Sequence, residues 1–277
     1  MSEIITIYCE GQKESHDITI LNKVIDGLNN NIFIKPIGGK LGSKAIVQYL
    51  ENNEERVLSK SKDYLLFRDR DFDQPIPEEE RLIIDIDRKT YYSYRTTIEN
   101  YLLDVSTFFH FLQEQKNNYK LDTEEAVKAL FIKVAKELKY YQAVRHTLGK
   151  LRFNNSFNTT WVTGSGTLPN ALDLETCRGK AWQLIENILN KSNQQWTKEI
   201  FEATLQEFLT LFEAESFFDE LKFLVYYQGK DFAKALTREL PNFSLENYYK
   251  YAKKHFDYTK YADLVGLRTI IEKQLTN

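Results

Sequence analysis

The chain has 277 residues, of which 42% are hydrophobic and 14% aromatic, so it can bury a substantial core and is not a disordered protein. Its formal net charge of -3 argues against a protein that holds nucleic acid by bulk charge alone, and its two cysteines are too few for a disulfide framework or a cysteine zinc site. No stretch has the length of a membrane span and the amino terminus lacks a signal-peptide pattern, so we expect a soluble, cytoplasmic protein.

The first 70 residues alternate between strand and helix patterns. β-branched residues 4–8 predict a buried strand, residues 18–28 place apolar side chains on one helical face, and residues 32–37 predict a second strand. A glycine pair then breaks the pattern, residues 45–50 predict a second helix, and the apolar run 64–67 predicts a third strand. Such alternation predicts a parallel sheet with right-handed crossovers and helices on both faces.

The pattern changes after a fourth predicted strand at residues 81–86. From residue 106 onward apolar residues recur every three or four positions, which indicates helices. The predicted helices cover residues 126–150, 174–190, 197–213, 214–227, 231–240 and 244–256. The sequence therefore predicts an α/β domain over residues 1–105 and an all-helical domain over residues 106–277.

Carboxylates follow the predicted strands at equivalent places. Glu10 ends the first strand, Asp69 and Asp71 follow the third, and Glu99 follows the fourth. Because the carboxyl ends of parallel strands share one edge of a sheet and bind ligands there, we expect these side chains to converge. Asp69 and Asp71 would face the same way on a continuing strand, and Glu14 would join Glu10 on a helix that begins directly after the first strand.

A set of five carboxylates predicts a bound cation, because like charges with no cation between them repel. Mg²⁺ prefers such oxygen ligands, with Mn²⁺ as the alternative ion, and a set of this size can hold two ions. Two ions about 4 Å apart could activate a water molecule and stabilise the leaving oxygen of a phosphodiester. The competing interpretation is a solvated, Asp-rich turn.

Several short motifs resemble those of a known fold. The chain resembles the TOPRIM fold, which topoisomerases, bacterial primases and several nucleases share, at Glu10-Gly11, Gly38-Gly39 and Asp69-Arg70-Asp71. More narrowly, the chain resembles TOPRIM nucleases of the overcoming-lysogenization-defect (OLD) type at Glu10-x-x-x-Glu14, Asp69-x-Asp71, Thr97-x-Glu99 and Gly229-Lys230. Within that type, the phrases at residues 67–71 and 98–102, in a chain without an ATPase domain, resemble the AriB effectors of the PARIS anti-phage defence system.

The resemblance covers residues 4–105, rests beyond them on Gly229-Lys230 and general helicity, and implies a role for each matching position. Metal ligands or the general base would be Glu10, Glu14, Asp69, Asp71 and Glu99. Thr97 and Asp73 would lie beside them, in support of the ligands. Lys230 would bring a positive charge to the scissile phosphate, although it could equally be an ordinary surface lysine.

Basic side chains outside the acidic set predict contacts with nucleic acid. Lys40 and Lys44 follow the second strand, in a turn that does not satisfy the phosphate-loop pattern, and could lie near a substrate phosphate. A basic stretch along the longest helix is suited to phosphate contacts that position a nucleic acid without reading its sequence. Its members with predicted contacts are Arg145, His146, Lys150 and Arg152. A solvated helix face is the alternative.

Taken with the resemblance, these residues predict a Mg²⁺-dependent TOPRIM endonuclease that hydrolyses phosphodiesters by a two-metal mechanism. The resemblance implies a homodimeric toxic effector that cleaves transfer RNA and is released by an ABC-type ATPase partner. The residues alone do not separate RNA from DNA, so a DNA nuclease of the OLD type is one alternative. A non-catalytic subunit that docks on an ATPase is the other.

Overall fold

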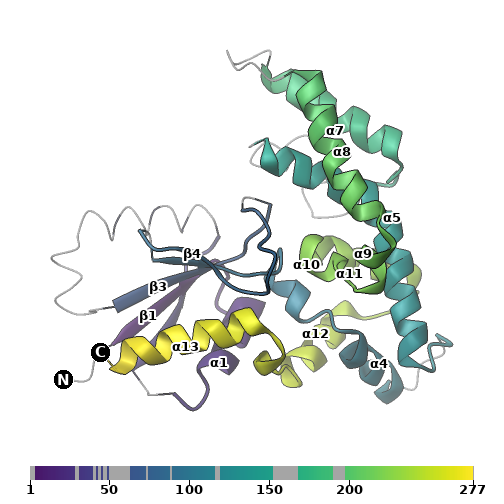
Figure 1. The fold of residues 1–277 in the computed structure, drawn as a ribbon. Helices are drawn as coiled ribbons and strands as arrows, with labels where there is room; N and C mark the ends of the chain where they lie inside the picture. The colour runs from purple at the N-terminus through teal and green to yellow at the C-terminus, as the bar shows by residue number, and fades with distance from the viewer. Residues whose placement is uncertain are drawn as a thin grey trace. The chain divides into compact units, whose positions relative to one another are not determined.

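The chain forms two compact units in a computed structural model (Figure 1). The structure describes residues 4–28, 31–39, 42, 45, 49, 63–72, 74–87, 89–115, 119–151, 168–189 and 197–276. We call the two units the sheet unit and the helical unit. The sheet unit comprises residues 1–70, 76–102 and 250–277, and the helical unit comprises residues 71–75 and 103–249. The sequence predicts one boundary near residue 105, whereas the chain returns to the sheet unit at residue 250.

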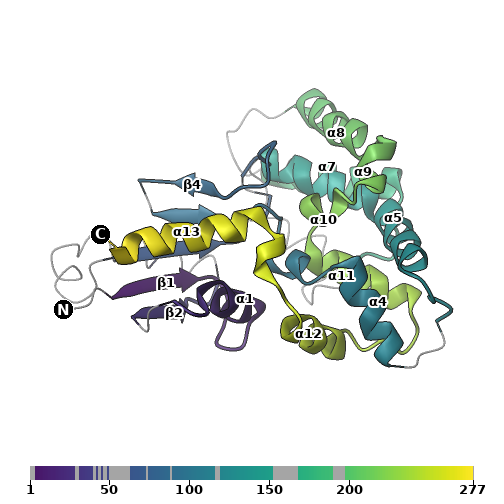
Figure 2. The same cartoon turned by 60° about the horizontal axis from the view of Figure 1, so that its bottom comes forward.

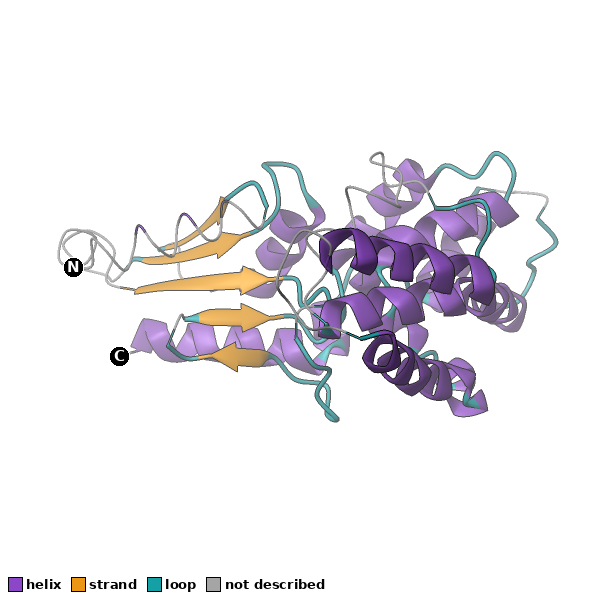
Figure 3. Ribbon diagram, turned by 90° about the horizontal axis from the view of Figure 1, so that it is seen from above, coloured by secondary structure: helices purple, strands orange, loops and turns teal. Residues whose placement is uncertain are grey.

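A five-stranded sheet, in the order β2-β1-β3-β5-β4, forms the centre of the sheet unit (Figure 3). The strands are β1 (Ile5–Cys9), β2 (Ile32–Pro36), β3 (Asp63–Arg68), β4 (Ile83–Asp85) and β5 (Thr90–Tyr92). Strands β2, β1, β3 and β5 are parallel, and β4 pairs antiparallel with β5 at one edge. Ile5, Ile7 and Cys9, on one face of β1, are fully buried, and Thr6 on the other face is 3% exposed, as expected for a central strand.

The predicted α/β sheet is confirmed as a mostly parallel sheet, and the first three predicted strands differ from β1, β2 and β3 by about one residue at each end. The fourth prediction needs a correction. Residues 81–86 contain the antiparallel edge strand β4, and the parallel strand that precedes Glu99 is β5, which the sequence pattern did not reveal. β5 has only three residues, too few for a periodic pattern to appear.

Helices α1 (His16–Ile25) and α13 (Ala262–Thr276) lie against each other on one face of the sheet (Figures 1 and 2). Leu264, Leu267 and Ile271 of α13 are fully buried. The Arg268 guanidinium donates from Nη1 to the carbonyl oxygens of Val24 and Asp26, both at 2.8 Å. The carboxyl-terminal helix is therefore a structural part of the sheet unit.

The helical unit is organised around α5 (Glu124–Lys150), a helix of 27 residues. Thr123 caps it by accepting a hydrogen bond from the amide of Ala126 at 3.1 Å. Phe131 and Leu138 on its inner face are fully buried. The remaining helices of this unit are α4 (Val105–Glu114), α7 (Leu174–Leu189), α8 (Lys198–Glu213), α9 (Glu215–Asp219), α10 (Phe223–Tyr226), α11 (Gly229–Glu239) and the first half of α12 (Leu245–Lys254). Among the described helices, none is long and apolar enough to span a bilayer.

Candidate functional site

The sheet has a topological switch point between β1 and β3. After β1 the chain crosses through α1 to β2 on one side, whereas after β3 it continues toward β5 on the other side. Such a point opens a crevice at the carboxyl ends of the two strands, where open α/β sheets bind ligands. In the β1–β3 register Cys9 pairs with Phe67, so Glu10 and Asp69 both lie just beyond the paired residues at this place.

Glu10 and Asp69 enter the candidate site from these two strand ends. Glu10 forms an ion pair with Nε of Arg68, and the two side chains are only 12% and 16% exposed. Asp69 is half-buried directly after β3. The register therefore places these two positions at the ends of neighbouring strands. Arg68 lies beside Glu10 as a positive charge that the sequence analysis did not include.

The pKa of the Cys9 thiol depends on the charges around the carboxyl end of β1. Burial is the largest cause that raises the pKa of Cys9, and the negative charges of Asp17, Asp69 and Glu10 add to it, so that the pKa is about 12 although a backbone hydrogen bond from Gly11 lowers it in part. Three carboxylates from separate positions in the chain therefore act on one buried atom at the end of β1. Burial, the largest cause, disfavours a charge of either sign, whereas the three carboxylates make the surroundings of this atom negative.

Asp17 is a member of this acidic group that the sequence analysis missed. It lies in the first turn of α1 with 6% of its surface exposed. A Cβ placed on Gly11 would lie 2.7 Å from Oδ2 of Asp17 and 1.9 Å from Oγ of Ser15. Gly11 therefore allows the turn after β1 to approach the start of α1 closely, and this approach brings Asp17 toward Cys9.

We expect Gly11→Ala to destabilise the sheet unit by about 1–3 kcal/mol, because its Cβ would also meet Cβ of Ser15 at 2.7 Å, an atom that rotation of the Ser15 hydroxyl does not remove. Gly266→Ala is the matched control in α13, where an added Cβ meets nothing within 4 Å and should stabilise by about 0.5–1 kcal/mol. The sequence of the sheet unit contains no tryptophan that could serve as a fluorescence probe. Amide hydrogen exchange of β1 and β3 is therefore the appropriate measurement, and equal protection in both variants would contradict the expectation.

Glu14 departs from its predicted position. The prediction required a helix that begins directly after β1, but α1 begins at His16. Glu14 lies in the preceding turn and is exposed. The i,i+4 relation to Glu10 on one helical face therefore does not hold, and Asp17 takes the inward position at the start of α1.

Asp69 and Asp71 do not lie on a continuing strand. β3 ends at Arg68, and Asp71 has a φ of 48°, a left-handed conformation that turns the chain. Asp69 belongs to the sheet unit and Asp71 to the helical unit. The argument that their side chains face the same way because of strand alternation is therefore wrong.

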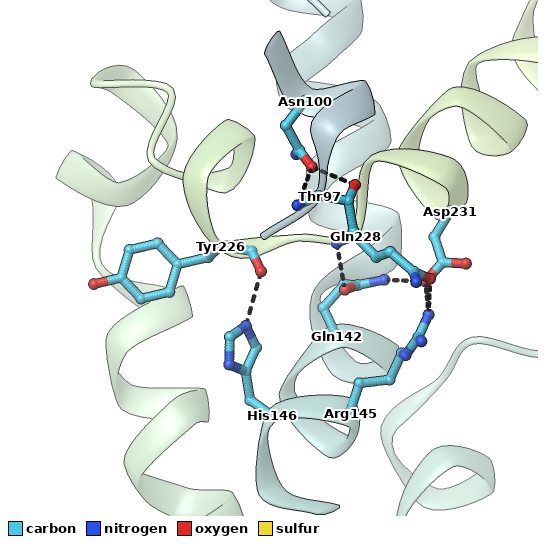
Figure 4. A network of polar contacts seen from close by, with 8 residues as sticks. All are labelled: Thr97, Asn100, Gln142, Arg145, His146, Tyr226, Gln228 and Asp231. Carbon is cyan, nitrogen blue, oxygen red and sulfur yellow. Dashed lines mark hydrogen bonds and ion pairs between the residues drawn. The ribbon is translucent and has the colours of Figure 1, made fainter. Parts of the chain in front are cut away.

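Glu99 and Thr97 lie in the segment Ser93–Tyr101, here called the 93–101 loop, which ends in the short 3₁₀ helix η1 (Ile98–Tyr101). Thr97 caps that helix: its amide and its hydroxyl both donate to Oδ1 of Asn100, at 3.1 Å and 2.8 Å (Figure 4). Glu99 is 5% exposed. A buried carboxylate in a loop after a parallel strand is consistent with the predicted position of Glu99, although that strand is β5.

Arg70, between the two aspartates, fixes the 93–101 loop. Its side chain is 1% exposed, and it donates from Nε to the carbonyl of Tyr94 at 3.0 Å and from Nη2 to Oγ1 of Thr96 at 2.8 Å. Its amide donates to Oγ of Ser93 at 3.2 Å. Arg70 therefore connects the segment that carries Asp69 to the loop that carries Glu99. The sequence analysis included the Asp69-Arg70-Asp71 motif, but it assigned no role to Arg70.

Glu10, Asp69 and Asp17 offer carboxylate oxygens, the ligands that a hard cation prefers. A complete ligand set is not assembled, however. Within the described parts of the chain, no three His, Cys, Asp or Glu side chains are grouped so as to hold a metal ion. Four of the predicted site residues, Lys40, Lys44, Asp73 and Arg152, lie outside the described residues.

In the helical unit, Arg145 has partners other than nucleic acid. It forms an ion pair with Asp231 and a hydrogen bond with Oε1 of Gln228 (Figure 4). Gln142 donates to Oδ2 of the same Asp231 at 2.8 Å and accepts from the amide of Gln228 at 3.1 Å. Arg145 and Asp231 are about nine-tenths buried. This network fixes the start of α11, where Lys230 lies exposed, and corrects the assignment of Arg145 to a phosphate contact.

His146 and Lys150 also have partners within the helical unit. His146 is 5% exposed, and its Nε2 lies 2.8 Å from the carbonyl oxygen of Tyr226. The ring of Phe72 packs against it edge-on at 4.7 Å between centroids, which explains why residues 71–75 belong to this unit. Lys150 forms an exposed ion pair with Glu207. Burial removes His146 from the predicted nucleic-acid surface, and Lys150 is the one of the three that remains exposed.

Comparison with known proteins adds no assignment. No protein-family model matches the chain, and a search of curated proteins finds no match.

Proposed function

We propose that the chain is a divalent-cation-dependent nuclease whose active site lies at the carboxyl ends of β1 and β3. The observation that supports this most strongly is the placement of Glu10 and Asp69 at the switch point between these strands, with Asp17 contributing to the same negative environment. A domain that needs only stability gains little from carboxylates gathered beside a buried strand end, because their mutual repulsion and desolvation cost free energy.

In this proposal Glu10 and Asp69 hold Mg²⁺ or Mn²⁺, with Asp71 and Glu99 as further ligands suggested by the resemblance to OLD-type nucleases. A bound divalent cation supplies Lewis-acid stabilisation of charge on a phosphodiester and lowers the pKa of a water molecule. Arg68 lies beside Glu10 and can neutralise that carboxylate while no cation is held. Lys230 is the candidate for charge stabilisation at the scissile phosphate, on the resemblance alone.

The resemblance to AriB effectors extends the proposal to substrate and partner. It suggests transfer RNA as the substrate, a homodimer as the active form and an ABC-type ATPase as the partner that restrains it. A DNA nuclease of the OLD type uses the same carboxylates, so it remains the alternative enzyme. A non-catalytic docking subunit is the alternative outside enzymes.

The purified chain should cleave one class of nucleic acid in Mg²⁺ or Mn²⁺ and lose that activity completely in EDTA. Transfer RNA, duplex DNA and single-stranded DNA are incubated separately with the wild-type protein and with Asp69→Asn, and new ends are followed on denaturing gels. Cleavage of transfer RNA that disappears in Asp69→Asn supports the proposed substrate, and cleavage of DNA alone supports the OLD-type alternative. Cleavage that survives EDTA and Asp69→Asn equally overturns the metal site.

A further inference from the structure

The 93–101 loop has a second anchor besides Arg70, in the carboxyl-terminal segment. Oδ2 of Asp263, in the first turn of α13, accepts a hydrogen bond from the amide of Tyr94 at 2.9 Å. The same oxygen accepts a hydrogen bond from the hydroxyl of Tyr101. One carboxylate oxygen therefore joins the two ends of the loop, and Thr97 and Glu99 lie between the joined residues.

Neighbouring contacts reinforce this connection. The hydroxyl of Tyr261 donates to the carbonyl oxygen of Tyr101 at 2.9 Å. The Arg95 guanidinium lies over the rings of Tyr261 and Tyr101, at 4.8 Å and 5.4 Å from their centroids, and donates from Nη1 to the carbonyl oxygen of Asn100 at 2.7 Å. The loop is therefore bound along its length to residues 261–263.

The contact between Asp263 and the 93–101 loop is buried, unlike a hydrogen bond at the protein surface. Asp263 is 0% exposed and Tyr101 is 1% exposed. Burial raises the pKa of Asp263 above its usual value, while the hydrogen bonds from Tyr101 and Tyr94 lower it in part. Burying a carboxylate costs free energy that an apolar side chain would not cost, so the contact is better explained by the loop conformation that it specifies than by general stability.

We propose that Asp263 is a positioning residue: by joining Tyr94 to Tyr101 it fixes the loop conformation that presents Glu99 to the metal site. The role of Glu99 in this inference rests on the proposed function. The attachment of the loop to Asp263 rests only on the hydrogen bonds from Tyr94 and Tyr101. Hydrogen bonding by the Oδ2 acceptor, more than the charge, performs this role. Oδ1 of Asp263 is buried and receives no hydrogen bond from the described residues, so an asparagine can place its carbonyl at Oδ2 and its amide at Oδ1.

The test compares Asp263→Ala with the conservative Asp263→Asn in the full-length protein. Amide hydrogen exchange of residues 94–101 should accelerate at least about 10-fold in Asp263→Ala and less than about 3-fold in Asp263→Asn, while β1 keeps its wild-type protection. Calorimetric titration with Mn²⁺ should show affinity weakened about 10-fold or more in Asp263→Ala and retained in Asp263→Asn. Glu272→Ala is the control, because Glu272 lies on the same helix and is 46% exposed.

A Glu99→Gln background shows whether Asp263 acts through Glu99. If it does, adding Asp263→Ala to Glu99→Gln weakens Mn²⁺ binding no further. An equal further loss in that background, faster exchange throughout β1, or unchanged exchange in the loop would each overturn the inference. A wild-type protein that binds no Mn²⁺ overturns the proposed metal site and the link to Glu99, and exchange confined to the loop would then still support Asp263 as the loop's anchor.

Discussion

Replacing Glu10 with glutamine is expected to lower divalent-cation-dependent cleavage by about 10³-fold while leaving the sheet unit folded. The glutamine retains an oxygen that can accept the hydrogen bond from Nε of Arg68, which in the wild type is paired with Glu10. It removes the negative charge that a hard cation requires. Initial cleavage rates at saturating Mg²⁺, together with amide exchange of β1, measure the two effects separately.

Two variants control for the position of that charge. Glu14→Gln removes the same group from an exposed turn and should change the rate less than about 10-fold, because Glu14 is not held on a helix beside Glu10. Arg68→Gln removes the other member of the ion pair and should retain cleavage. If Glu10→Gln and Arg68→Gln lose activity and protection of β1 together, Glu10 serves only the ion pair and the metal site is contradicted.

Replacing Arg145 with methionine is expected to destabilise the helical unit by about 3–5 kcal/mol, because it leaves the buried carboxylate of Asp231 without its ionic partner. Tryptophan fluorescence during urea denaturation is a suitable probe, since Trp182 lies on α7 in this unit. A second substitution, Asp231→Asn, should recover part of the loss by removing the uncompensated charge. The recovery distinguishes the buried pair from the lost contact between the Arg145 guanidinium and the ring of Phe72.

Lys150→Met is the matched control on the same helix. Its ion pair with Glu207 is about half exposed on both sides, so the expected loss is below about 1 kcal/mol. The comparison also separates the two roles considered for Arg145. A phosphate-binding arginine would lose affinity for nucleic acid without losing stability, and an Arg145→Met protein as stable as Lys150→Met would contradict the structural role.

The parts of the fold that the sequence predicted are those with a local signal. Buried parallel strands appear as short apolar runs, which located β1 and β3 and therefore Glu10 and Asp69 at their ends. The long helix α5 was predicted from its spacing of apolar residues. In contrast, β5 has only three residues. In α13 the apolar Val265 is 38% exposed, so the apolar residues do not mark one buried face, and neither element shows a clear hydrophobic period in the sequence.

The long-range contacts of the 93–101 loop and of the helical unit had no local signal in the sequence. Asp263 meets Tyr94 across 169 residues of sequence, and Arg145 meets Asp231 across 86, and no spacing rule connects positions so far apart. Asp17 was missed because the predicted helix began directly after β1, which placed Glu14 beside Glu10, whereas α1 begins at His16 and has Asp17 in its first turn. Tertiary packing, more than residue type, decided which charges are paired.

The most direct measurement of the central claim is the sequencing of RNA and DNA ends from cells that express the chain, with and without its candidate ATPase partner, beside a Glu10→Ala protein. We expect new ends that depend on Glu10 and are concentrated in transfer RNA. New ends in DNA alone would move the protein to the OLD-type DNA nucleases while retaining the metal site. No Glu10-dependent ends in either nucleic acid, in the presence or absence of the ATPase, would contradict the nuclease and favour the docking subunit.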